Sequence, residues 1–168
     1  MTIEATTPDA LPSGAFAGRE TFRERIRDAF SAAAAHGWRE LVICDASFHD
    51  WPLGERDVVQ ALGRWARNGQ QFVMLARHYD DVVRHHALFV EWRRQWSHRI
   101  DCRVCASADP LDLPSALWSS AWALQRLDPV RSSGVCGAEP QRRQQVREEL
   151  DGWLHRSTAG FAATTLGL

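Results

Sequence analysis

The sequence predicts a single α/β domain in which a mostly parallel central sheet carries helices on both faces. Two apolar runs, Leu41–Cys44 and Phe72–Leu75, are continuous rather than alternating, which is typical of strands that are covered on both sides. Between them Val58, Leu62 and Trp65 recur at the spacing of one helical face. Because strand–helix–strand connections are right-handed with few exceptions, we expect the two strands to be parallel neighbours.

The first part of the chain contains a leader and a helix. Residues 1–17 show no periodicity, so we expect a mobile leader, followed by one α/β domain over residues 18–168. The segment Thr21–Glu24 matches a capping box, which predicts the start of an amphipathic helix that ends at His36 and Gly37. Asn68 and Gly69 are expected to end the helix of the central unit.

The next stretch predicts a long helix and a third strand. Residues 79–97 have a broad apolar face, with room for a break near His85 and His86. Ile100–Cys105 is expected to be the third parallel strand, followed by a proline-containing loop.

The last third of the chain is harder to assign. Residues 116–127 fit a strand or a helix, and the alternating tryptophans favour a strand over Ala121–Leu127. A short strand at Val135–Cys136 and a closing helix from Pro140 complete the pattern. The apolar tail Phe161–Leu168 is expected to pack on the domain or on a second subunit.

Composition excludes several classes of protein. The 168 residues contain no lysine, and all 20 Lys and Arg side chains are arginine. This excludes Schiff-base chemistry on a lysine and phosphate sites that depend on a lysine. The net charge of −1 gives no electrostatic argument for nucleic acid or for a membrane surface. The segment Trp92–Trp96 interleaves aromatic and basic residues as single-strand binding surfaces do, but the nearly neutral net charge favours tryptophans that pack on the sheet and arginines that face solvent.

The chain has no long apolar run and no signal-peptide pattern, so we expect a cytoplasmic protein.

The four cysteines predict free thiols and no cofactor. Cys102 and Cys105 have a CxxC spacing, yet they fall within a predicted strand, where residues three apart point to opposite faces. A redox pair would open a helix, and a zinc pair would need a tight turn. We therefore expect buried thiols and assign no metal site.

The candidate site lies where the predicted parallel strands end, because open α/β sheets bind ligands at the carboxyl ends of their strands. These ends are rich in polar and aromatic groups. The expected ligand-binding residues are Asp45, Ser47, His49, Asp50, Trp51, Arg77, His78, Tyr79 and Asp109.

Three of these residues are candidates for catalysis, and each has a structural alternative. Asp45 directly follows a buried strand, but it could equally order the loop that begins at Ser47. His49 could be a base, a metal ligand with Asp45 and Asp50, or a solvated loop residue. His78 could help to bind an anion at a helix start, although the aspartates that follow it could satisfy the same amides.

The order of elements resembles a single half of the phospholipase D-like fold, as in uncharacterised bacterial members of that superfamily. The similarity spans Phe16–His155 and includes the segments DASFHDWPLGE and ARHYD. The superfamily signature is histidine, any residue, lysine, four residues and aspartate. Here its nearest approach starts at His98, with Ile100 and Cys105 in place of lysine and aspartate. The resemblance implies a homodimer, because two such halves normally pack together, and it implies no phosphodiesterase activity.

The leading functional prediction is therefore a non-catalytic ligand- or protein-binding module. The alternative is a hydrolase or transferase for a small phosphorylated or anionic substrate, with Asp45 and His49 as acid, base or metal ligands and Arg77 as the anion clamp. Nucleic-acid binding ranks third, and weaker binding after Trp96→Ala would favour it.

Overall fold

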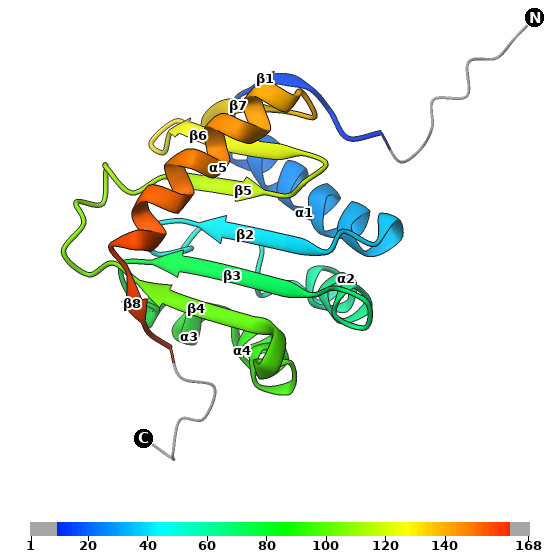
Figure 1. The fold of residues 1–168 in the computed structure, drawn as a ribbon, viewed down its shortest axis with the longest axis vertical. Coiled ribbons are helices and arrows are strands. Elements are labelled where there is room, and N and C mark those ends of the chain that lie inside the picture. The colour runs from blue at the N-terminus through cyan, green and yellow to red at the C-terminus, as the bar shows by residue number, and fades with distance from the viewer. Residues whose placement is uncertain (1–9, 162–168) are drawn as a thin grey trace, which may run out of the picture.

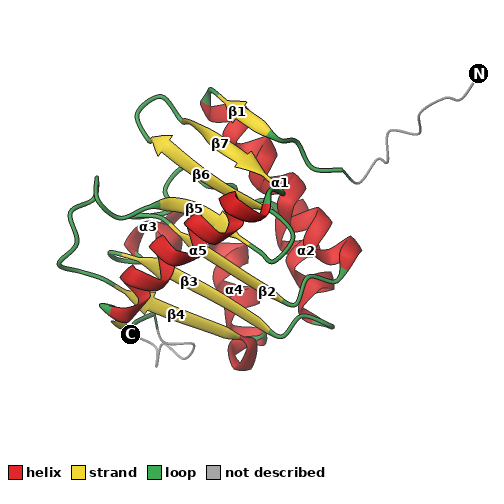
Figure 2. Cartoon of the chain, turned by 45° about the horizontal axis from the view of Figure 1, so that its top comes forward, coloured by secondary structure: helices red, strands yellow, loops and turns green. Residues whose placement is uncertain are grey.

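The computed structural model describes residues 10–161, which build one eight-stranded sheet with helices on both faces (Figures 1 and 2). The order of strands across the sheet is β1-β7-β6-β5-β2-β3-β4-β8. In chain order the elements are β1 Gly14–Phe16, α1 Arg19–His36, β2 Glu40–Cys44, α2 Arg56–Ala66, β3 Gln71–Ala76, α3 Asp80–His85, α4 Ala87–Gln95, a 3₁₀ turn Ser97–Arg99, β4 Ile100–Val104, β5 Ser115–Trp118, β6 Ala123–Asp128, β7 Ser133–Gly137, α5 Pro140–His155 and β8 Thr158–Ala159.

The three central strands confirm the predicted parallel unit. β2 pairs with β3 in register from Glu40 opposite Gln71 to Cys44 opposite Leu75, and β4 continues in the same direction beside β3. Their carboxyl ends consequently meet at one edge of the sheet, where the site was expected.

The prediction of a mostly parallel sheet is wrong. Of the strand pairs in the described residues, only β2–β3 and β3–β4 are parallel, and the other five are antiparallel. The ambiguous residues 116–127 cause most of this difference. They form two short strands, β5 and β6, around a turn in which the Ser119 hydroxyl accepts hydrogen bonds from the amides of Ala121 and Trp122. A single strand over Ala121–Leu127 therefore describes only the second arm of a hairpin.

The sheet separates two apolar cores. On one face α1, α2 and α4 pack against alternate residues of the central strands, including Leu41 and Phe72. On the other face α5 crosses the sheet and buries Val146 and Leu150 against the intervening residues, such as Val42. This alternation explains why β2 and β3 are apolar at every position after their first residues, Glu40 and Gln71.

The start of the domain differs from the prediction. Gly14–Phe16, assigned to the leader, pair with β7, whereas residues 1–9 lie outside the described part of the chain. Helix α1 begins at Arg19 with Gly18 as its N-cap and no side-chain cap, so the Thr21 capping box is not used. Its predicted end is confirmed, because Gly37 takes the left-handed conformation at φ 64°.

A charged clamp joins α1 to the start of α2. The guanidinium of Arg27 donates two hydrogen bonds to Glu55, of 2.7 and 2.8 Å, and Arg23 donates a third of 3.0 Å. The hydrogen bonds from Arg27 and then Arg23 lower the pKa of Glu55, although partial burial opposes them. The clamp fixes the end of the β2–α2 loop, which carries several candidate site residues.

The predicted long helix is broken where the two histidines suggested. α3 ends at His85 and α4 begins at Ala87. Beyond α5 the chain forms β8 against β4, and Phe161 stacks on Tyr79 with ring centroids 4.8 Å apart. The rest of the predicted apolar tail, residues 162–168, lies outside the described residues.

Candidate functional site

A buried ion-pair network occupies the centre of the expected site. Arg126, on β6, has a side chain that is 3% exposed and lies between the carboxylates of Asp45 and Asp50. It donates hydrogen bonds to Asp45 at 3.1 Å and to both oxygens of Asp50 at 2.5 and 3.1 Å. Burial opposes the charge of Arg126, but the bonds and charges of Asp50 and Asp45 raise its pKa.

The Arg126 guanidinium also makes two hydrogen bonds to serine hydroxyls and a cation–π contact with a phenylalanine ring. Its Nε donates to the Ser115 hydroxyl at 3.1 Å and one Nη donates to the Ser132 hydroxyl at 3.3 Å. Its Cζ atom lies over the Phe22 ring, 4.1 Å from the ring centroid. A cation with so many partners has no donor left for a ligand, so Arg126 joins the sheet to the β2–α2 loop and does not bind substrate.

Asp45 also orders the loop that follows it. Its second oxygen accepts hydrogen bonds from the amides of Ser47 and Phe48, at 3.1 and 2.8 Å, which is the structural alternative named for this residue. Phe48 has a positive φ of 58°, and its ring packs edge-on against Trp51. Trp51, predicted to bind a ligand, is 1% exposed and belongs to the core.

The residues after β3 are likewise held within the fold. Arg77 donates from Nε to the carbonyl oxygen of Ala108 at 2.6 Å, and His78 lies 3.7 Å from Asp80. Tyr79 is buried, which raises the pKa of its phenol.

Two further contacts complete this edge. The Tyr79 hydroxyl lies 2.8 Å from the carbonyl oxygen of Arg103 and 3.1 Å from that of Met74. Asp109 accepts a hydrogen bond from the amide of Leu111 in its own loop. These contacts stabilise this edge of the sheet, and those of Asp45 with Arg126 and the Ser47 and Phe48 amides give it a structural role.

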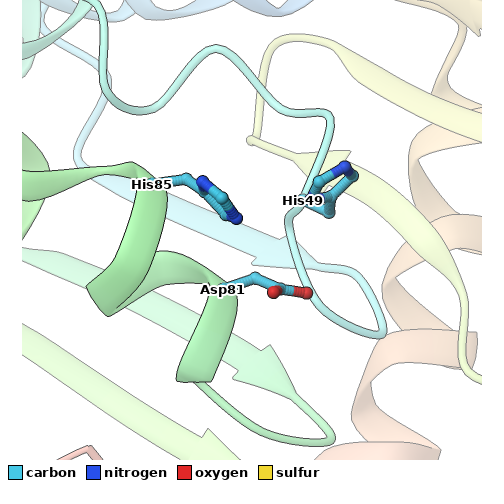
Figure 3. Close-up of side chains that lie close together, drawn as sticks. All are labelled: His49, Asp81 and His85. Atoms are coloured by element: carbon cyan, nitrogen blue, oxygen red, sulfur yellow. The ribbon is translucent and has the colours of Figure 1, made fainter.

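Among the predicted site residues, His49 is the one that lies beside two further potential metal ligands, His85 and Asp81. Its ring approaches that of His85 edge-on, with centroids 5.4 Å apart, and Asp81 lies beside both (Figure 3). Ligand atoms of the three side chains all lie within 4.8 Å of one another. The structure thus separates His49 from Asp45 and Asp50 and groups it with two residues of α3 instead.

A second candidate site lies between α2 and α4, near the amino ends of β3 and β4. The groove has a volume of about 380 Å³ and is lined by Gln60, Gly63, Arg64, Arg67, Gln95 and Trp96. Arg64 and Arg67 are exposed, and neither makes an ion pair or a side-chain hydrogen bond within the described residues. Trp96 is partly buried at the same wall, and its ring lies 5.9 Å from that of His98.

Sequence reasoning missed the principal residues of both regions. Arg126 falls in the predicted strand Ala121–Leu127 without any signal of its own, because its partners Asp45 and Asp50 lie far away in the sequence. The arginines of α2 lie opposite the apolar face of Val58, Leu62 and Trp65, a position that by itself predicts only solvent exposure. Asp81 and His85 lie one helical turn apart, a spacing visible in the sequence, but His85 was considered only as the place of a helix break.

Comparison with known proteins shows similarity at the level of fold. No protein-family model matches the chain, and no curated protein matches it. The chain is similar to the solved structure of TrmBL2, an archaeal chromatin protein reported to show a novel mode of DNA binding. The TM-score is 0.65 at 11% sequence identity, and the alignment covers 94% of this chain and 57% of that protein. This chain therefore corresponds to little more than half the length of its structural neighbour.

The neighbour and the sheet topology together overturn the earlier resemblance. The chain is similar in fold to an archaeal chromatin protein and its own sheet is mixed, so the predicted phospholipase D-like fold is wrong and nothing supports the predicted bacterial relationship. The homodimer was implied only by the pairing of two phospholipase D-like halves, and that argument falls with the resemblance. Among the described residues no helix is long and apolar enough to cross a membrane.

Proposed function

We propose that this domain binds DNA through the groove between α2 and α4. The observation that carries the proposal is a pair of exposed arginines, Arg64 and Arg67, which have no ion-pair partner among residues 10–161 and lie beside the partly buried ring of Trp96. The similarity to a chromatin protein that binds DNA supports the same function. Arginine suits this role because its planar guanidinium binds phosphate oxygens through two parallel hydrogen bonds.

The groove continues into a basic stripe along α2. Arg56, Gln60, Arg64 and Arg67 are all exposed and recur at one-turn spacings, so they share one side of the helix. No carboxylate lines the groove within the described part of the chain. The three arginines of the stripe outnumber the exposed Asp57 of the same helix, so this surface is locally positive although the whole chain has a net charge of −1.

The size of the basic stripe sets the expected strength of binding. Three arginines that contact phosphates give a salt dependence with a slope of about −3 in log K against log salt for duplex DNA. Where the DNA is single-stranded, Trp96 adds an aromatic ring face on which an unpaired base can stack. Binding is expected to be sequence-tolerant, because phosphate contacts position a protein on DNA without reading its bases.

This proposal replaces the functions predicted from the sequence. The ligand- or protein-binding module, the alternative enzyme for a small anionic substrate, and the exclusion of nucleic acid are all contradicted by the similarity to a DNA-binding chromatin protein. Sequence reasoning excluded nucleic acid from the total charge alone. A total cannot reveal that many acidic groups, such as Asp45, Asp50 and Glu55, are already paired with arginines elsewhere.

We place the DNA-binding function in the cytoplasm, where the four buried free thiols would stay reduced.

Removing both groove arginines tests the proposal. The double variant Arg64→Gln/Arg67→Gln is expected to bind a labelled DNA duplex at least about tenfold more weakly at low salt, because two phosphate contacts are lost. Its salt slope should also become shallower by about 2. Fluorescence anisotropy over a series of salt concentrations measures both quantities.

A matched control removes an arginine elsewhere. Arg131, in the turn between β6 and β7, has a side chain that is 84% exposed, and Arg131→Gln should leave affinity and slope close to those of the wild type. If the groove variant binds as tightly as the control, and with the same slope, DNA does not use the groove.

A further inference from the structure

We infer that His49, Asp81 and His85 form a binding site for a divalent transition-metal ion, with Zn²⁺ as the preferred occupant. Two imidazole nitrogens and one carboxylate oxygen converge between the β2–α2 loop and α3, all within 4.8 Å of one another (Figure 3). His49 and His85 are exposed and Asp81 is partly buried, so an ion can reach the site from solvent. Neither the fold similarity nor the DNA-binding groove bears on these residues.

The two ligands on α3 are placed by helical geometry. Asp81 and His85 are four residues apart, so their side chains leave the same side of the helix, one above the other. Figure 3 shows both of them projecting toward the loop that carries His49. Ligand atoms bound to zinc lie about 2.0–2.2 Å from the metal, so the three ligand atoms must move closer together to bind one ion.

The third ligand, His49, lies between two residues, Phe48 and Asp50, that are both held by contacts with other elements. Before it, the carbonyl oxygen of Phe48 lies 2.8 Å from Nε2 of His86, the residue that follows His85. After it, Asp50 is held by Arg126 through both carboxylate oxygens. The contact between Phe48 and His86 thus ties the loop to the end of α3 directly beside two of the ligands. Such support is what a metal site needs to hold its ligands in position.

The chemistry of the donors selects the class of metal. Imidazole nitrogens favour zinc, copper, nickel and iron over magnesium or calcium, which prefer sites made only of oxygen ligands. Three protein ligands leave at least one coordination position for water. The cysteines do not compete, because all four are buried, and burial raises the pKa of the Cys102 thiol to about 11.

The site lies at the opposite end of the central strands from the DNA groove. His49 follows the carboxyl end of β2 and Asp81 follows that of β3, whereas Arg67 and Trp96 precede the starts of β3 and β4. The two sites can therefore be tested separately, and loss of one should leave the other unchanged.

Calorimetric titration of the full-length, tag-free protein with Zn²⁺ tests the inference. The wild type is expected to bind one ion per chain, and His49→Ala, Asp81→Asn and His85→Ala should each weaken binding by more than about tenfold. The matched control is His155→Ala, which removes an exposed histidine at the end of α5. Circular dichroism of each variant checks the fold, and exposed His49 and His85 should tolerate alanine.

Substitution with Co²⁺ identifies the ligands independently. The wild type should show visible d–d absorption without the near-ultraviolet charge-transfer band of a cobalt–thiolate bond, and His85→Ala should lose that absorption. Unchanged Zn²⁺ affinity in His49→Ala and His85→Ala, equal loss in His155→Ala, or a cobalt–thiolate band in the wild type would each overturn the site.

Discussion

Replacing Arg126 with leucine is expected to lower the free energy of unfolding by about 3–5 kcal/mol, because it leaves a buried carboxylate without its partner. Asp45 is 6% exposed, and Arg126 is its ion-pair partner among the described residues. The substitution also removes the link between β6 and the β2–α2 loop that passes through Asp50. Denaturation by urea, followed by circular dichroism, measures the loss as a lower midpoint at an unchanged slope.

The origin of this effect can be separated from simple loss of packing. Adding Asp45→Asn and Asp50→Asn to Arg126→Leu should restore part of the stability, because no unpaired charge then remains buried. The exposed control Arg131→Leu should change the midpoint little. A loss in Arg126→Leu as small as in this control would show that the network contributes nothing to folding.

The second large effect is expected from Phe72→Ala, which should cost about 3–5 kcal/mol of unfolding free energy. Phe72 is fully buried at the middle of the parallel unit, and its ring lies 5.9 Å from that of Trp65 and 5.3 Å from that of Trp92. Removing it leaves a cavity among rigid aromatic side chains, which cannot collapse to fill the space. The same denaturation experiment measures the change.

Two variants calibrate this result. Phe72→Leu keeps part of the volume and should cost less than Phe72→Ala. Leu127→Ala removes a side chain that is 62% exposed on β6, so it should have little effect. If Phe72→Ala and Leu127→Ala have equal stability, the core between the sheet and α4 is not packed as described.

The parallel centre of the fold could be predicted because its signals are local. Continuous apolar runs identified β2 and β3, and the periodicity of the intervening residues identified α2. The antiparallel half lacked such signals. β5 is only four residues long, and its turn depends on hydrogen bonds to the Ser119 hydroxyl, so the sequence could not distinguish one strand from a hairpin.

The candidate site was predicted less well because its contacts are distant in the sequence. The sequence placed Asp45 at the correct edge but could not reveal that Arg126 would bind it. Trp51 and Tyr79 were expected to face a ligand, yet both fill the core, since large aromatic side chains bury more apolar surface there. The basic groove escaped notice because its walls come from two helices that are separated by β3 and α3.

The central claim is that DNA binds between α2 and α4, and amide chemical shifts recorded while duplex DNA is added test it most directly. We predict that the largest changes fall at Gln60–Arg67 and around Trp96, and that they fade as salt is raised. Residues near His49 and Asp45, at the other end of the strands, should change little. Changes centred on that opposite edge, or no changes at low salt, would contradict the claim.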